Sequence, residues 1–160
     1  MKYNDNPFSE IMDSDIRNAN SGFIIQGVNA QGKMGKGLAK SIYDRWPNVK
    51  SEYINEYFDN NDFFHLGSFH IVNIKDNLNV VNIVSQEYYG NDGRQYVSYP
   101  AIEVALINLI RLINKNKWEK IIHVPKIGCG LAGGNWDVIK GIFKKVIPND
   151  FKLIYWNYAP

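Results

Sequence analysis

A glycine-dense turn carrying two lysines directly follows an apolar run near the start of the chain. Residues 24–40 read IIQGVNAQGKMGKGLAK, and a helical pattern begins at Leu38. Glycines lack a Cβ, so the backbone of such a turn comes close to a ligand. A strand, a glycine loop and a helix in this order present backbone N–H groups and a helix N-terminus to a phosphate. The turn therefore predicts an anion-binding loop.

A nucleotide-binding P-loop is the first interpretation to test. Gly27 and Gly32-Lys33 match the start of that motif, but Met34 stands where a hydroxyl should hold Mg²⁺. We also find no apolar strand ending in an aspartate as a second metal ligand. The match to a P-loop therefore fails. The turn taken alone leaves open that it only connects a strand to a helix.

A second glycine-rich loop follows another apolar run late in the chain. Residues 126–135 read KIGCGLAGGN, between a predicted strand at 120–125 and a predicted helix at 136–146. In open α/β sheets, ligands bind beyond the carboxyl ends of the strands. If the strands ending at Val28 and Pro125 are neighbours, the two loops face one cleft. Two facing sets of backbone N–H groups favour a diphosphate.

The elements that must position these loops alternate between strands and helices. The helix after the first loop stops at Trp46-Pro47, because the residue before proline disfavours the helical region. Residues 1–20 predict loop with at most one edge strand. Near-continuous apolar strands predict a layered α/β domain. The other predicted elements are a strand at 22–28, helices at 38–45, 49–58 (capped by Asn48) and 98–114, a hairpin of strands at 69–74 and 80–84, and a final strand at 151–156.

Composition narrows the class of protein. The 160 residues carry a net charge of +2 and predict a single domain spanning 1–160. This balanced charge argues against stable nucleic-acid binding. One cysteine excludes an internal disulfide, and the three scattered histidines, including His123 in a predicted strand, show no metal spacing. No apolar run is long enough for a membrane span, and the polar N-terminus is unlike a signal peptide. We expect a monomeric cytoplasmic protein without cofactor or metal.

Together the two glycine loops resemble a known family. The patterns VNAQGxMGxGLA at residues 28–39 and PxIGCGLAGGxW at residues 125–136 are similar to those of macrodomains. The nearest branch is the small phage and bacterial type described as ADP-ribose 1″-phosphate phosphatases. The resemblance spans residues 22–155. It implies a three-layer α/β/α fold around a mixed, mostly parallel central sheet, with an ADP-ribose cleft above the strand ends.

The resemblance also implies which residues contact ADP-ribose. Asn29 would contact the distal ribose and position a water, and Tyr155 or Trp156 would lie against the adenine. Three polar residues stand where the family has others: Asn6 replaces an adenine-reading Asp, Gln26 a phosphatase His, and Gln86 a hydrolase Lys. The phosphates would be lined from one side by Met34, Gly35, Lys36 and Gly37, and from the other by Gly128, Cys129, Gly130, Leu131 and Ala132.

The activity implied first is hydrolysis of ADP-ribose 1″-phosphate to ADP-ribose and phosphate. Asn29 and Lys36 are the predicted catalytic residues, with Asp92 in the polar loop at 85–95 as a candidate general base. Two alternatives stay open. The chain removes ADP-ribose from a protein or nucleic-acid adduct, or it only binds ADP-ribose as a reader.

Overall fold

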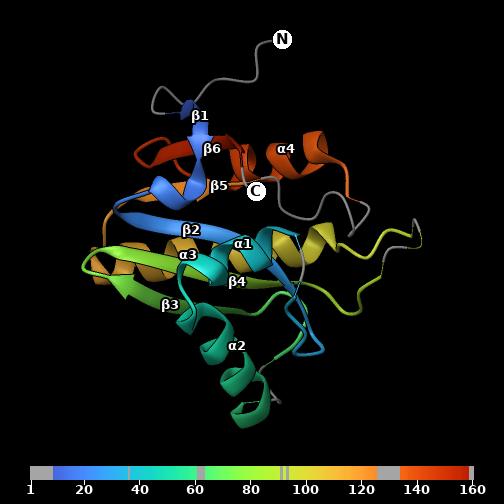
Figure 1. Cartoon of the computed structure of the whole chain (residues 1–160). Coiled ribbons are helices and arrows are strands. Elements are labelled where there is room, and N and C mark those ends of the chain that lie inside the picture. The colour runs from blue at the N-terminus through green and yellow to red at the C-terminus, as the bar shows by residue number, and fades with distance from the viewer. Residues whose placement is uncertain are drawn as a thin grey trace.

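The computed structural model describes residues 9–35, 37–60, 64–90, 92, 94–125 and 134–158, with the side chains of 9–13 and 157–158 excepted. The described residues form one mixed sheet with helices on both faces (Figure 1). The strands are β1 (Ser9–Asp15), β2 (Gly22–Asn29), β3 (Phe69–Lys75), β4 (Leu78–Gln86), β5 (Ile121–Val124) and β6 (Lys152–Tyr158). The α-helices are α1 (Gly37–Arg45), α2 (Asn48–Asp59), α3 (Tyr99–Asn116) and α4 (Trp136–Val146).

The sheet has the strand order β1-β6-β5-β2-β4-β3. All neighbouring strands are parallel except β3 and β4, which form an antiparallel hairpin. Asp76, at a φ of 35°, lies in the tight turn that joins them. Parallel neighbours need long crossovers, and helices supply them here. The predicted mixed, mostly parallel sheet is confirmed.

Two helices cover each face of the sheet. On one face α3 and α4 bury apolar residues that include Ile25, Val81 and Leu106. On the other, α1 and α2 cover Ile24, Val80 and Val28, in two smaller clusters. The central strands β2, β4 and β5 are buried nearly throughout, on both faces, which explains why their sequences are largely apolar, whereas β3 is only partly buried. The three-layer arrangement predicted from the sequence is therefore confirmed (Figure 1).

Local signals set the helix ends with one exception. The Ser98 hydroxyl accepts a hydrogen bond from the Ala101 N–H and begins α3, and the Asn135 side chain caps α4 in the same way. The prediction that Asn48 caps α2 is wrong. Pro47 occupies the cap position, and the Asn48 amide instead donates to the Asn73 carbonyl on β3. This contact across elements outweighs the local preference of asparagine for the cap.

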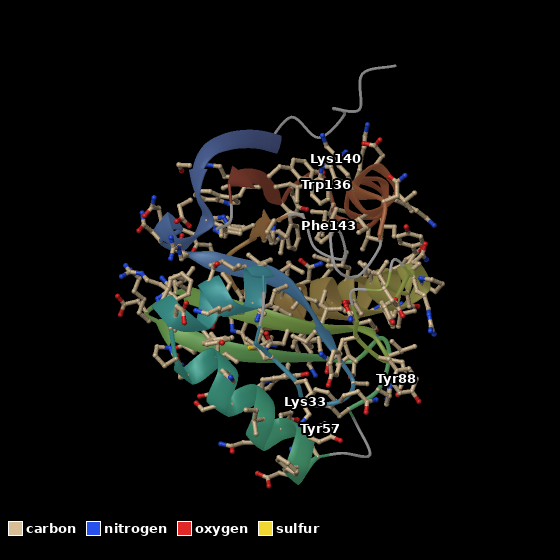
Figure 2. The ribbon with its side chains drawn as sticks, turned by 45° about the vertical axis from the view of Figure 1, so that its right-hand side comes forward. Lys33, Tyr57, Tyr88, Trp136, Lys140 and Phe143 are labelled. Carbon is tan, nitrogen blue, oxygen red and sulfur yellow. The ribbon has the colours of Figure 1, made fainter. Side chains whose placement is uncertain are left out.

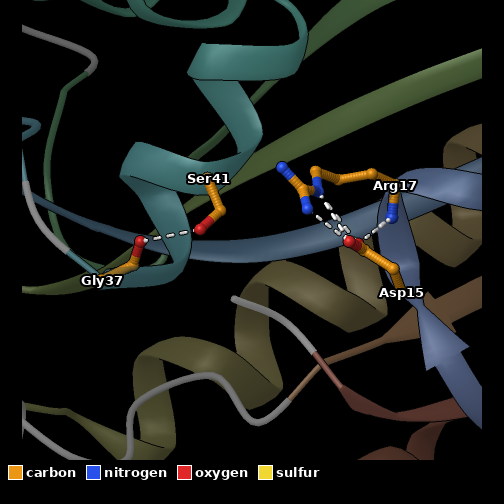
Figure 3. A network of polar contacts seen from close by, with 4 residues as sticks. All are labelled: Asp15, Arg17, Gly37 and Ser41. Carbon is orange, nitrogen blue, oxygen red and sulfur yellow. Dashed lines mark hydrogen bonds and ion pairs between the residues drawn. The ribbon is translucent and has the colours of Figure 1, made fainter.

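The first described strand, β1, is the edge strand allowed by the sequence, and it pairs with β6 at the other end of the chain. Asp15 closes it: its carboxylate accepts from the backbone N–H of Arg17 at 2.9 Å and from Arg17 Nε at 2.8 Å (Figure 3). The side-chain hydrogen bond from Arg17 holds the pKa of Asp15 below its usual value. Figure 3 also shows the nearby first turn of α1, where the Ser41 hydroxyl donates to the Gly37 carbonyl at 3.5 Å. No helix in the described part of the chain is long and apolar enough to cross a membrane.

Candidate ligand-binding site

Asn29 ends β2 and holds the glycine turn in shape. Its Oδ1 accepts from the backbone N–H groups of Gln31 at 3.0 Å and Lys33 at 3.2 Å. Its Nδ2 donates to the Lys33 carbonyl at 2.7 Å. An Asn side chain commonly bonds its own following backbone in this way. The second hydrogen on Nδ2 has no acceptor among the described residues, so Asn29 keeps one donor to offer.

A buried tyrosine supports Asn29 from below. The Tyr53 hydroxyl donates to the Asn29 carbonyl at 2.7 Å and lies 3.1 Å from its Oδ1. Burial raises the pKa of Tyr53, so this group stays a protonated donor. The spacing of Tyr53 places it on the buried side of its helix, which was the available signal. That spacing does not name Asn29 as the partner, because the contact joins α2 to β2.

The turn rests on aromatic rings and needs glycine at Gly32. That residue has a φ of 70°, and a Cβ there would lie 2.6 Å from the Tyr57 ring. Tyr57 in turn packs edge-on against Phe64, with ring centroids 5.4 Å apart. Figure 2 shows Lys33 and Tyr57 together at this end of the molecule. The backbone of the turn is thus positioned by packing as well as by hydrogen bonds.

Beyond this base, the turn opens outward. A Cβ on Gly35 would meet none of the described atoms within 4 Å, and Gly37 begins α1 at a φ of 60°. Met34 differs, since its side chain is buried beneath the turn with Val28. Any contact of Met34 with a ligand therefore comes from its backbone. An open main chain at a helix N-terminus is suited to an anion.

The two predicted glutamines are placed differently. Gln86 is the register partner of Asn29 at the end of β4, and its Nε2 donates to the Tyr88 carbonyl at 2.7 Å. Gln26 is fully buried inside the layers and donates to Asn82 Oδ1 at 2.6 Å. The structure brings Gln86 to the site and keeps Gln26 in the interior, so the ligand contact implied for Gln26 has no support in this geometry.

Asp92 is held within its own loop. The loop is tied to the glycine turn by a hydrogen bond from Gln31 Nε2 to the Glu87 carbonyl at 3.1 Å. The backbone N–H of Arg94, at 3.2 Å, and the Tyr96 hydroxyl, at 2.9 Å, both donate to the Asp92 carboxylate. Both hydrogen bonds hold the pKa of Asp92 below its usual value, and the one from Arg94 has the larger effect. A carboxylate with a lowered pKa is a weak base, so this arrangement does not favour the predicted role.

The two candidate adenine contacts lie on opposite faces of the sheet. Tyr155 is 7% exposed and packs against Trp136, with Lys140 4.9 Å from its ring centroid. Figure 2 shows Trp136 and Lys140 close together at α4. Burial raises its pKa to about 12. Trp156 is 5% exposed and its indole N–H donates to His123 Nδ1 at 3.0 Å. Both rings therefore have packing partners within the protein.

The carboxyl ends of β2 and β5 lie at the same edge of the sheet, because these strands are parallel neighbours. The sequence predicts that the two glycine loops face one cleft if the strands before them are neighbours. The pairing of β2 with β5 meets that condition. Several residues implied as ligand contacts fall outside the described residues. They are Asn6, Lys36, Gly128, Cys129, Gly130, Leu131 and Ala132.

His123, expected from the sequence to be a buried strand residue, has both ring nitrogens bonded. Nδ1 accepts from Trp156, so Nε2 carries the hydrogen and donates to the Ser21 carbonyl at 2.6 Å. Burial lowers the pKa of His123 below 6.5, opposed by the Ser21 bond and, more weakly, by Glu119, while Lys152 adds to the lowering. Protonation of Nδ1 would remove the acceptor for Trp156.

We expect the free energy of unfolding to fall on acidification. The unfolded chain binds a proton at His123 near pH 6.5 and the folded chain only at lower pH. The contribution of His123 to the free energy of unfolding is therefore fully present above pH 6.5. It is lost as the pH falls toward the pKa of His123 in the folded protein, by at most about 1.4 kcal/mol per pH unit. Denaturant unfolding at pH 5.0, 6.0 and 7.0 measures this slope. His123→Gln, which keeps an acceptor and a donor, should flatten it, and an unchanged slope in that variant would contradict the assignment.

Known proteins resemble this chain in sequence and in fold. The Macro domain family model matches residues 25–143. A solved protein of unknown function from Bacteroides thetaiotaomicron is 26% identical, with a TM-score of 0.81 over 92% of this chain and 96% of its own. The macrodomain of Mycobacterium tuberculosis DarG is 21% identical, with a TM-score of 0.75 over 95% and 97%.

A third structure contains a ligand. Thermosipho africanus DarTG, solved in complex with ADP-ribose, is 17% identical, with a TM-score of 0.76 over 98% of this chain and 42% of its own. No curated protein matches the chain significantly.

Proposed function

The chain belongs to the macrodomain family, and from this premise we propose that it binds ADP-ribose at the carboxyl ends of β2 and β5. One observation carries the proposal: in the turn between β2 and α1, the main chain at Gly35 is open, since no atom of the described residues would lie within 4 Å of a Cβ there. Thermosipho africanus DarTG, which matches this fold over 42% of its own chain, was solved in complex with ADP-ribose, and this supports the choice of ligand.

The pyrophosphate is proposed to lie against the turn. Gly35 leaves space above the backbone, and the positive φ of Gly37 opens α1 at that point. The first backbone N–H groups of a helix lack partners within it and attract negative charge. Hydrogen bonds of Asn29 and Tyr53 fix residues 29–33 of the turn, so little ordering of this part is needed on binding.

The distal ribose is proposed to lie near Asn29. The remaining Nδ2 hydrogen of Asn29 would donate to a ribose hydroxyl or to a water. Gln86 lies beside it in register at the end of β4. This gives Asn29 two roles, one within the turn and one toward the ligand.

The finer proposal is hydrolysis of ADP-ribose 1″-phosphate. Water attacks phosphorus, the bond from phosphorus to O1″ breaks, and O1″ takes up a proton, giving phosphate and ADP-ribose. Asn29 would orient the water and Lys36, with turn N–H groups, would stabilise the developing charge. Asp92 would accept the water's proton only after release from Tyr96.

Two assays test these proposals in sequence. Calorimetry with ADP-ribose, with AMP as the comparison ligand, should show binding in the micromolar range, about −8 kcal/mol. Absence of any binding would refute the proposed function. Phosphate release from ADP-ribose 1″-phosphate, lost in Asn29→Ala, would support the phosphatase. Release of ADP-ribose from a modified glutamate or thymidine without phosphate release would indicate a hydrolase, and binding alone a reader.

A further inference from the structure

A concave site lies at the opposite edge of the sheet from the glycine turn. It is a half-open pocket of about 240 Å³ beside the β3–β4 hairpin turn. In Figure 1 this turn lies at the left, while the turn after β2 lies at the right. We call it the Trp118 pocket; its lining residues are Phe23, Ile71, Asn73, Asp76, Asn77, Asn79, Trp118 and Glu119.

The floor of the Trp118 pocket is made by three strands. Phe23, Asn79 and Asn73 lie side by side in register on β2, β4 and β3. Ile71 lies one pleat further along β3 on the same face. The Asn73 amide donates to Asn79 Oδ1 at 3.0 Å and to the Asp76 carbonyl at 3.2 Å, which fixes the hairpin end. The floor is therefore rigid and partly apolar.

Trp118 forms an aromatic wall. The chain leaves α3 through Lys117 in the left-handed region, at a φ of 54°, and the Trp118 N–H donates to the Ile113 carbonyl at 3.1 Å. This turn sends the indole over Phe23, with ring centroids 6.1 Å apart and ring planes at 36°. Trp118 stays 41% exposed, although it is a large apolar side chain. Phe23 beneath it is only 3% exposed, so the ring surface that faces the pocket is mainly that of Trp118.

The charged residues that line the Trp118 pocket are acids, although Lys75 and Lys117 stand next to lining residues in the chain. Asp76 and Glu119 are the charged residues among those that line the Trp118 pocket. Glu119 accepts a hydrogen bond from the Ser21 hydroxyl at 3.3 Å, and the neighbouring Lys120 is paired with Asp150 at 2.5 Å. The carboxyl end of α3, which carries partial negative charge, lies just before Trp118.

Aromatic faces beside carboxylates select one class of ligand. A metal ion needs several oxygen ligands, and no group of three or more His, Cys, Asp or Glu residues suited to a metal exists among the described residues. An alkylated ammonium group is attracted by ring faces, tolerates apolar contact and is complementary to carboxylates. The pocket volume is below that of a drug-sized site, which fits a small group.

We propose that the Trp118 pocket binds a methylated ammonium group, as found in choline or in trimethyl-lysine. Both acids are exposed, so solvent screens them, and we expect a dissociation constant on the order of 1 mM. The site is separate from the ADP-ribose site, and ADP-ribose should neither compete with it nor be needed for it.

The test follows the indole N–H signal of Trp118 by NMR, assigned with Trp118→Leu, while choline is added. Its uncharged isostere 3,3-dimethyl-1-butanol serves as the matched ligand. Choline should shift the signal saturably and bind at least about tenfold more tightly than the isostere, since only choline carries the charge. Equal binding of the two, the same shift with NaCl, or no saturable shift would overturn the proposal.

Protein variants test the acids separately. Asp76→Asn keeps a residue tolerant of positive φ, and Glu119→Gln keeps the shape of its side chain. Each should weaken choline binding about threefold or more, whereas Glu52→Gln, an exposed acid on the other face of the sheet, should not. Equal effects of all three would show a general charge effect and refute the pocket.

A last comparison identifies the source of the ligand. Tighter binding of a trimethyl-lysine peptide than of choline would indicate a methylated protein, and the reverse would indicate a small metabolite. Both results support a methylammonium site. Displacement of choline by ADP-ribose would overturn it, and an ADP-ribose titration without any binding would leave it intact, since the two sites lie at opposite edges of the sheet.

Discussion

Gly35→Val is expected to abolish ADP-ribose binding while the protein remains fully folded. A Cβ at Gly35 would meet no atom of the described residues within 4 Å, and this residue is not among those with positive φ, so we expect valine to be accommodated in the free protein. The same side chain would occupy the space proposed for the pyrophosphate. Loss of two hydrogen bonds to charged oxygens, at about 1.5–3 kcal/mol each, weakens binding at least about 100-fold. Calorimetry measures the affinity and thermal unfolding measures the stability.

Gly141→Ala is the matched control for this result. Gly141 lies within α4, and a Cβ there also meets no atom of the described part of the chain within 4 Å. Alanine in place of glycine in a helix adds about 0.5–1 kcal/mol of stability and should leave binding unchanged. Gly35→Val binding ADP-ribose within threefold of the unaltered protein would show that the pyrophosphate lies elsewhere.

Asn29→Ala is expected to damage both the turn and the site. The substitution removes the acceptor for the Gln31 and Lys33 N–H groups and the donor to the Lys33 carbonyl. Three hydrogen bonds at about 1 kcal/mol each predict a loss of roughly 2–3 kcal/mol in the free energy of unfolding. ADP-ribose binding should weaken at least about tenfold beyond any effect of unfolding. Denaturant unfolding and calorimetry on the same samples measure the two losses.

Tyr53→Phe separates the two roles of Asn29. It removes the hydroxyl that donates to the Asn29 carbonyl and leaves the Asn29 side chain in place. We expect a loss of about 1–3 kcal/mol in stability, because a buried acceptor becomes unpaired, but only a few-fold loss of affinity. If both variants lose affinity equally, Asn29 acts on the ligand only through the turn, and the direct contact is wrong.

Most elements of this fold were predictable because their signals are local. The helix at Trp136–Val146 and the strand beginning at Gly22 follow from apolar periodicity and from caps and turns next to them in the chain. The wrong assignment, the cap at Asn48, is a case where a partner on β3 competes for the side chain. Of the candidate site, the turn and Asn29 were found because glycine spacing is also a local signal.

The sequence by itself determined the alternation of strands and helices and the presence of a glycine-rich turn after β2, since each depends on residues within a few positions. Only the tertiary structure decided that Tyr53 supports Asn29, that Gln26 is interior, and that Trp118 folds over Phe23. Each of these contacts joins elements distant in the chain. Their geometry follows from which strands pair and in which register. Packing of the whole core sets this pairing, and no single segment of the sequence is enough to predict it.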